Sequence, residues 1–291
     1  MSTVSHILLA TDLSPASRHA AEHAAAWARR HQAKLHLFYV QTPLQIEYSW
    51  LAFAETAEQI EEVQQAADKA LSKLAAELDA PCTYSSVREP AVAPTVADYA
   101  KNNAVDLVVV GSHGYKGLAH FALGSVAAEV ARLSPVPTLV VSSKHAQPPE
   151  ELGAILAAVD FSALAHDAFR YAGQLAEAAN SKLIAAHVVD PAPLPPYYHD
   201  DFLQAGQEQA RKSLDQWLAE TELSEQAEGV ISHGHPHQKL AELAKDFAAD
   251  LIVMGSQGLR GLDRFLLGST AERVLRAAPC PVLVYRNDLY A

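Results

Sequence analysis

The chain has 291 residues, 49% of them hydrophobic and 19% charged, a balance typical of a soluble globular protein long enough for two α/β domains. Its formal net charge of −12 is unlike that of a nucleic-acid-binding protein, which needs clustered Lys and Arg, so we expect no nucleic-acid partner. Two cysteines make no disulfide framework, and the first apolar run is too short for a signal peptide or membrane span, so we expect a cytoplasmic protein with no membrane partner.

The first half of the chain alternates between strand and helix patterns. Residues 6–11 are a short continuous apolar run, typical of a strand buried on both faces of a parallel sheet. Ser14 and Pro15 then predict a helix start, with Ser14 as the N-cap and the helix continuing to about residue 32. The later elements are expected to be strand 35–40, helix 55–78, strand 83–87, helix 91–103, strand 107–110, a helix from residue 124, and strand 138–141. This order predicts a parallel sheet with right-handed crossovers.

A polar linker at residues 142–151 separates this pattern from a second copy of it. Residues 155–160 repeat residues 7–12 at an offset of 148, whereas the later glycine loops repeat at an offset of 144. A repeat this long is a duplicated domain, because solenoid units recur every 20–50 residues or so. We therefore expect two tandem domains, 1–143 and 152–291, each with a doubly wound, Rossmann-like five-stranded parallel sheet.

Each half carries a glycine-rich loop after its fourth strand. Two glycines separated by two residues are followed, nine residues later, by a Gly-Ser pair that opens a helix pattern. The two sets are Gly111, Gly114, Gly124 and Ser125, and Gly255, Gly258, Gly268 and Ser269. Glycine lets the backbone approach a ligand closely, and a helix N-terminus offers free N–H groups and a favourable dipole to an anion. The spacing favours a phosphate or nucleotide site, although the glycines could also be only turn and cap residues.

An aspartate follows the first strand of each half, Asp12 in the first and Asp160 in the second. In an open doubly wound sheet of order 3-2-1-4-5, ligands bind beyond the strand C-termini, between strands one and four. Each aspartate would then face the glycine loop of its own half. The alternative is that these aspartates help to cap the helices that begin near Ser14 and Ser162, and the two roles are compatible.

Both halves resemble universal stress protein domains, whose nucleotide-binding signature is Gly-x2-Gly-x9-Gly-Ser/Thr. The resemblance covers nearly the whole chain and is especially close over residues 255–284. It implies the sheet order 3-2-1-4-5 and bound ATP or another adenine nucleotide. It also implies Mg held through the nucleotide near Asp12 and Asp160, with no metal site made by the protein alone. By this resemblance the nucleotide-binding residues, with the valines at the adenine, are Asp12, Val40, Gly111, Gly114, Gly124, Ser125 and Val126, and Asp160, Val188, Gly255, Gly258, Gly268, Ser269 and Thr270.

The two candidate sites differ. His113 and Gln257 stand where many members of that family carry a basic residue, and an unperturbed histidine is mostly neutral at pH 7. The turn before the third helix reads Gly-His-Pro at 234–236, and we match it to Arg-Glu-Pro at 88–90, which places Glu89 near the first crevice. We therefore expect the second site to bind more tightly.

Three histidines at positions 233, 235 and 237 invite a metal interpretation, since three imidazoles could bind Zn or Ni. A strand-to-helix turn would point them in diverging directions, and we favour a structural or solvated role. Aromatic residues in the loops after the second strand of each half, Tyr48 and Trp50, and Tyr197 and Tyr198, could cover the long helix or form a lid or partner surface.

No catalytic residue is assigned, because the sequence has no Ser-His-Asp signature, nucleophile elbow or reactive-cysteine context. We expect a stress-response protein that acts as an ATP-binding or signalling module with an unidentified protein partner. Slow ATP hydrolysis or phosphoryl transfer is one alternative, since the crevice offers one aspartate, hydroxyls and, on loops, Lys116 and Arg260. A nucleotide-free interaction protein, with both motifs as relics, is another.

Each half ends in a short apolar strand, 138–141 and 282–285, after a Pro-x-Pro sequence. In the order 3-2-1-4-5 these strands are sheet edges, and an exposed apolar edge is an association hazard. We expect the two edges to pair antiparallel across a pseudo-two-fold axis, with Val140 and Val284 at the core of an intrachain pseudo-dimer. A further homodimer is compatible with this arrangement.

Overall fold

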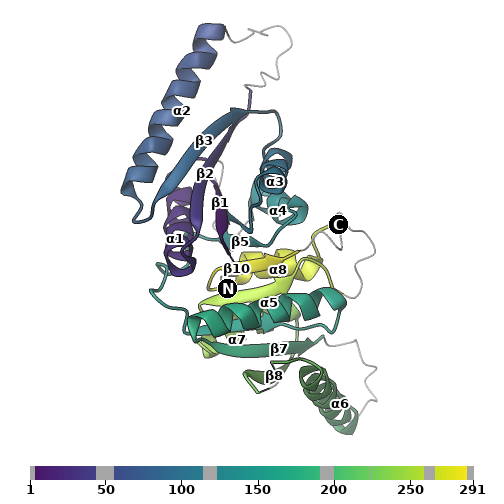
Figure 1. The fold of residues 1–291 in the computed structure, drawn as a ribbon. Coiled ribbons are helices and arrows are strands. Elements are labelled where there is room, and N and C mark those ends of the chain that lie inside the picture. Colours follow the sequence, from purple (N-terminus) through teal and green to yellow (C-terminus); the bar gives the residue numbers. More distant parts are fainter. Residues whose placement is uncertain are drawn as a thin grey trace, which may run out of the picture.

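The computed structural model describes residues 4–43, 56–113, 123–190, 200–223, 225–258 and 266–286, which form two similar α/β halves (Figure 1). The first half contains β1 (His6–Ala10), α1 (Pro15–His31), β2 (Lys34–Gln41), α2 (Ala57–Glu77), β3 (Cys82–Arg88), α3 (Val92–Asn102), β4 (Leu107–Gly111), α4 (Ser125–Leu133) and β5 (Thr138–Val141). The second half contains β6 (Ala154–Ala158), α5 (Ala163–Ala179), β7 (Lys182–Val189), α6 (Asp200–Ala219), β8 (Ala227–His233), α7 (Pro236–Asp246), β9 (Leu251–Gly255), α8 (Ser269–Ala277) and β10 (Val282–Tyr285). The predicted elements are confirmed, but the aromatic loops at Tyr48, Trp50, Tyr197 and Tyr198 lie outside the described residues.

The strands form one ten-stranded sheet in the order β3-β2-β1-β4-β5-β10-β9-β6-β7-β8. Within each half the described strands pair in parallel, and β5 pairs with β10 antiparallel. The order 3-2-1-4-5 predicted for each half is confirmed. Because the halves run in opposite directions, the carboxyl ends of their strands lie at opposite edges of the sheet.

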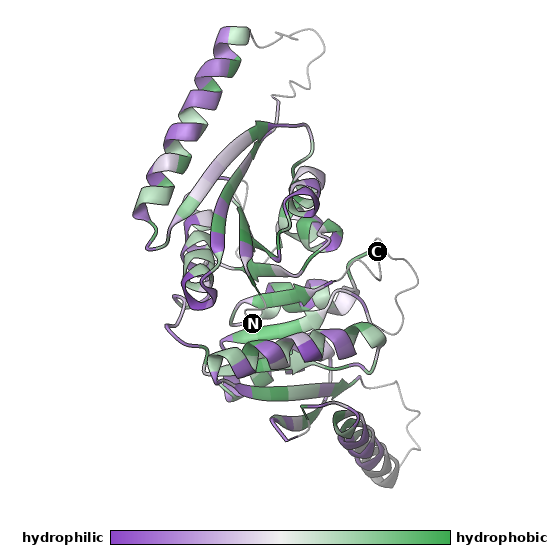
Figure 2. Cartoon of the chain, viewed as in Figure 1, coloured by the Kyte–Doolittle hydropathy of each residue, from purple (hydrophilic) through white to green (hydrophobic). Residues whose placement is uncertain are grey.

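The core forms two layers, one on each face of this sheet. Alternate residues of a strand point to opposite faces, so Ile7 and Leu9 join one cluster and Leu8 the other. The first cluster packs under α1, α2, α5 and α6, and the second under α3, α4, α7 and α8. Each cluster contains residues of both halves, and Figure 2 shows the apolar strands running between the helices. Among the described residues, no helix is both long and apolar enough to cross a lipid bilayer.

The helices that follow β1 and β6 begin as the sequence predicts. The Ser14 side chain accepts a hydrogen bond from the N–H of Ser17, with Pro15 at the first helical position. Ser162 caps α5 in the same way through the N–H of Ala165. These caps fix the residues at which α1 and α5 begin. They therefore fix the position of each helix start beside the carboxyl end of β1 or β6.

The two halves are joined by their last strands. Leu139 and Leu283 lie directly opposite each other at the centre of the pairing, flanked by the pairs Val140–Val282 and Thr138–Val284. Val140 and Val284 are 2% and 1% exposed, so the predicted edge pairing is confirmed, with the leucines rather than these valines as the central pair. Both edge strands are thereby covered.

We predict that the double substitution Val140→Asp and Leu283→Asp separates the halves. Two carboxylates buried without partners should lower the free energy of unfolding by at least about 3 kcal/mol. Small-angle scattering should then show a larger radius of gyration, and circular dichroism reports how much helix remains. The control substitutes Val63 and Tyr84, which are 46% and 41% exposed, by Asp. Unchanged compactness and stability of the first variant would contradict this account of the interface.

Two buried histidines lie where α1 meets the linker between the halves. The His23 ring donates a hydrogen bond to the carbonyl of Ala146, with 3.1 Å between Nε2 and O. The N–H of Ser142 donates to Nδ1 of His145 at 3.1 Å. Burial lowers the pKa of each imidazole to about 4, so both are neutral at pH 7.

We predict that acid weakens this contact. Because the pKa of each histidine is lower in the folded than in the unfolded chain, its contribution is complete above pH 6.5 and decreases as the pH falls from 6.5 towards 4. At pH 5 the lowered pKa of each histidine should reduce the free energy of unfolding by up to about 2 kcal/mol. Urea unfolding at pH 7.5 and pH 5 measures this. His23→Gln keeps an N–H donor and should reduce the pH dependence, whereas the exposed His233→Gln should not. An equal pH dependence in both variants would rule His23 out as its source.

Candidate functional site

A cavity of about 770 Å³ lies in the second half, beyond the carboxyl ends of β6, β7 and β9 and against the first turns of α7 and α8. This is the switch point of the sheet, since β6 lies between β7 and β9 while the chain proceeds from β6 to β7. The residues that line the cavity are Ala158, Val159, Asp160, Ala165, Ala186, Val188, Asp190, His235, Pro236, His237, Leu240, Met254, Gly255, Ser256, Gln257, Gly258, Leu266, Leu267, Gly268, Ser269, Thr270, Ala271 and Arg273. All seven positions that the sequence selects in this half are among them.

The first half places its candidate residues at the same points of the fold. Asp12 follows β1, Val40 lies near the end of β2, and Gly111 ends β4. Gly124 caps α4, which places Ser125 and Val126 in its first turn. Gly114 lies outside the described residues.

The start of α8 is held tightly against the loop that leaves β9. The N–H of Gly268 donates to the carbonyl of Ser256 at 2.8 Å, and Gly124 makes the same bond to Ser112 at 2.7 Å in the first half. A Cβ added to Gly268 would lie 3.2 Å from that carbonyl oxygen. Glycine therefore favours the close approach of two backbone segments within the protein, which agrees with the alternative that these glycines are turn and cap residues.

A glycine at the N-cap also leaves the first turn of α8 without a side-chain cap. The first N–H groups of a helix have no partner within the helix, and here Ser269 and Thr270 line the cavity. Free helical N–H groups, hydroxyls and the positive end of a helix dipole are groups that favour a nearby anion. α4 begins in the same way after Gly124.

Asp160 connects the cavity to the start of α5. Its Oδ1 accepts hydrogen bonds from the N–H of Ser162 at 3.0 Å and from the Ser162 hydroxyl at 2.6 Å. Its Oδ2 lies so close to Gly258 that a Cβ added there would collide with it. The aspartate therefore supports the helix cap with one oxygen and faces the glycine loop with the other, so both roles considered from the sequence are compatible with the geometry.

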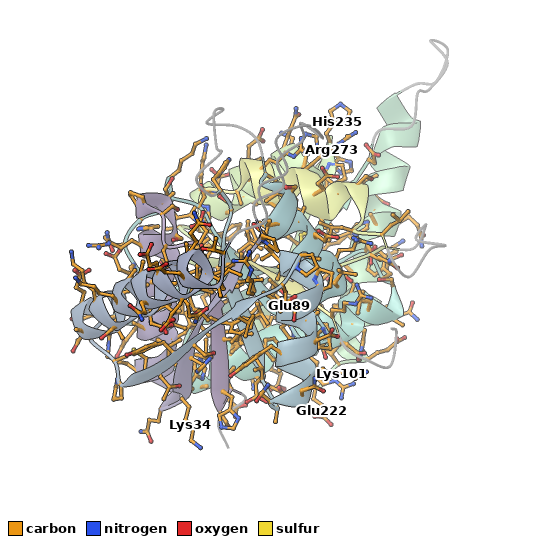
Figure 3. The ribbon with its side chains drawn as sticks, turned by 90° about the horizontal axis from the view of Figure 1, so that it is seen from above. Lys34, Glu89, Lys101, Glu222, His235 and Arg273 are labelled. Carbon is orange, nitrogen blue, oxygen red and sulfur yellow. The ribbon has the colours of Figure 1, made fainter. Side chains whose placement is uncertain are left out.

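Four charged or titratable side chains that the sequence did not assign to the site line the same cavity: Asp190, His235, His237 and Arg273. Figure 3 shows His235 and Arg273 together at one end of the molecule. Nδ1 of His235 lies 3.7 Å from Oδ1 of Asp190. Burial, followed by the nearby charges of Arg273 and His235, lowers the pKa of His237. Arg273 could have been found from the sequence, because a residue four positions after Ser269 lies on the same face of a helix.

The histidine-rich turn does not assemble a metal site in the part of the chain that the structure describes, which contains no group of three His, Cys, Asp or Glu side chains able to hold a metal ion. The rings of His235 and His237 stack with 6.2 Å between their centroids. His233 is exposed at the end of β8. Two of the three histidines therefore belong to the rim of the cavity.

Comparison with known proteins shows the family. The model of the universal stress protein family matches residues 3–142 and again residues 152–286. The chain belongs to the universal stress protein family.

Its relatives include both partial and full-length matches. Universal stress protein Rv2005c of Mycobacterium tuberculosis is 34% identical over 202 residues, which are 67% of this chain and 66% of that protein. A universal stress protein of Mycolicibacterium smegmatis is 27% identical over 289 residues, 96% of each chain. The crystal structure of a universal stress protein from Archaeoglobus fulgidus, 24% identical, superposes with a TM-score of 0.71 over 98% of this chain and 99% of that one. The last likeness shows that the two-half fold is shared.

The halves of this universal stress protein differ in the turn before the third helix, and the sequence match made for it was wrong by one residue. The offset between the halves is 145 from Cys82 to Ala227 at the start of β3 and β8, and 144 from Val92 to Pro236 at the start of α3 and α7. Glu89, rather than Arg88, therefore occupies the position of Gly234, as their bonds to the ends of β2 and β7 also show. The turn of the first half is one residue longer, so its backbone can turn without a glycine.

Gly234 has φ +135°, a conformation that side chains rarely adopt, and an added Cβ would lie 2.9 Å from the Lys239 side chain. We predict that Gly234→Ala lowers the free energy of unfolding by about 1–3 kcal/mol. Gly206 is the matched control, because it lies in α6 with open space around its Cα. Gly206→Ala should stabilise the protein by about 0.5–1 kcal/mol. Urea denaturation measures both changes, and a Gly234→Ala variant as stable as wild type would show that the turn is not strained.

Proposed function

We propose that this universal stress protein binds an adenine nucleotide, ATP or a close relative, and acts in the cytoplasm as a stress-response binding or signalling module. Each half, 1–143 and 152–291, is one binding unit. The observation that carries the proposal is the cavity of about 770 Å³ in the second half, where a glycine loop and an uncapped helix start meet at the switch point. Drug-sized ligands occupy pockets of about 300–1,000 Å³, so the cavity has room for a nucleotide.

The lining of the cavity suggests how a nucleotide lies in it. Val188 and Met254 offer an apolar wall for the adenine. The glycine loop, Ser269 and Thr270 would receive the phosphates. The second oxygen of Asp160 faces this loop, and Mg²⁺ commonly binds one or two carboxylates together with substrate phosphates. Mg²⁺ bound through the nucleotide therefore fits the residues present, with Asp160 as its protein ligand.

Slow ATP hydrolysis is the second candidate, and Arg273 is the observation that favours it. An arginine near the phosphates supplies the charge stabilisation that phosphoryl transfer needs. One oxygen of Asp160 is already engaged with Ser162, which makes this carboxylate a poor base for activating water. Any turnover would therefore be slow. A colorimetric assay for released phosphate separates a binding module from an ATPase.

We predict that Ser269→Pro weakens ATP binding at the second site at least about tenfold, because it removes one N–H donor and one hydroxyl from the phosphate position. Proline fits the first position of a helix, and Gly268 already has φ −59° and ψ 141°, as a residue before proline should. Ser125→Pro is the matched change in the first half, where Gly124 has φ −63° and ψ 142°. Calorimetry on each variant reports the affinity of the other, intact site.

We expect the site that remains in Ser125→Pro to be the tighter one. Thermal melting checks that both variants fold. Unchanged ATP affinity in folded Ser269→Pro would contradict the assignment of the phosphate position. Mass spectrometry of ligand released from the purified protein is an independent test: an adenine nucleotide is the expected result. Absence of binding to every adenine nucleotide in calorimetry would favour the nucleotide-free interaction protein.

A further inference from the structure

The two halves carry opposite charges at one equivalent position of α4 and α8, the helices that begin at the candidate sites. α4 and α8 are both nine-residue helices that begin with a serine after the capping glycine. Their fifth residues are Glu129 in the first half and Arg273 in the second. The change from Arg to Glu alters the formal charge by two units at a point one helical turn from the proposed phosphate position.

The neighbouring helix changes in the same direction. α3 and α7 both have eleven residues, and their second residues are Ala93 and His237. Ala93 is 1% exposed and carries no polar group, whereas His237 lines the second cavity. Both His237 and Arg273 line the cavity, and the charge of Arg273 contributes to lowering the pKa of His237. The second half thus has two nitrogen-bearing side chains where the first has a methyl group and a carboxylate.

Neighbouring ion pairs leave Arg273 available for a ligand. Within α8, Glu272 pairs with Arg276 rather than with Arg273. Among the residues that the structure describes, no carboxylate lies within ion-pair distance of Arg273. In α4, by contrast, Glu129 lies 3.2 Å from Arg132, an exposed pair that only partly screens the carboxylate.

We propose that the two sites select adenine compounds by charge: the second site takes nucleotides with two or three phosphates, and the first takes adenosine or a nucleotide with a single phosphate. This inference rests on the proposed function and adds ligand selectivity to it. An arginine beside a partly enclosed phosphate attracts each added negative charge, whereas a glutamate repels it. Uncharged adenosine gains or loses little from either side chain. The sites open at opposite edges of the sheet, so each ligand can bind without contacting the other.

The chain itself supplies a probe for the second site. It contains two methionines, Met1 and Met254, and Met254 lies in the wall of the second cavity. A ¹³C-methyl methionine spectrum therefore contains one cavity signal that reports binding there alone. Val110 occupies the equivalent position at the end of β4 and is 5% exposed, so Val110→Met introduces a matched reporter for the first site. Titrations with ATP and with adenosine then give four dissociation constants.

In the wild-type chain, titration of the Met254 signal should give a dissociation constant at least about tenfold lower for ATP than for adenosine. Arg273→Glu should weaken the binding of ATP at the second site at least about tenfold and change the affinity for adenosine by less than about twofold. Arg276→Glu is the control, because it makes the same charge change on α8 at a residue outside the cavity lining. In the Val110→Met chain, Glu129→Arg should strengthen ATP at the first site and leave adenosine unchanged.

Equal ratios of ATP to adenosine affinity at the two sites would overturn the selectivity, as would equal effects of Arg273→Glu and Arg276→Glu. Both results keep the proposed function, since adenine compounds still bind. If neither reporter responds to any adenine compound, the proposed function fails first and the selectivity fails with it. If Arg273→Glu loses affinity for ATP and for adenosine alike, the role of Arg273 is structural and the selectivity is overturned. A loss of thermal stability in Arg273→Gln would confirm that structural role.

Discussion

The antiparallel pairing of β5 with β10 is the contact on which the rest of the molecule depends. Each half alone would expose an apolar edge strand, and the opposed Leu139 and Leu283 cover both edges with one set of backbone hydrogen bonds. The pairing turns two five-stranded sheets into one sheet with a shared core layer on each face. It also fixes the direction of the halves, and so places the two candidate sites at opposite edges.

The candidate site also depends on backbone geometry, at the switch point of the sheet. In an open parallel sheet the strand ends at the switch point diverge, and a loop and a helix start can fill the space from opposite sides. Gly268 has two effects. It lets the backbone of α8 approach Ser256, and it leaves the first N–H groups of the helix without a side-chain cap. The glycine that allows this close packing is therefore also the one that leaves the start of α8 without a side-chain cap.

The two halves share this geometry and differ at residues around it. The positions that set the backbone are shared: the glycine caps at 124 and 268, and the aspartates at 12 and 160. The positions that set the local charge differ, with Glu129 against Arg273 and Ala93 against His237. A fold can keep a binding geometry and change its local charge in this way, because the residues that set the backbone differ from those that set the charge.

Local pattern was enough to predict the strands, the helix starts at Ser14 and Ser162 and the duplication, because each depends on near neighbours along the chain. The sheet order was predicted only through the resemblance to universal stress protein domains. The edge pairing was also predictable, although its centre at Leu139 and Leu283 required the actual register. Only the tertiary structure brought Asp190, His235, His237 and Arg273 to one cavity and aligned Glu89 with Gly234. The sequence could not show this, because those residues come from separate elements, and a one-residue difference in a turn changes which side chains meet without changing the pattern of either element.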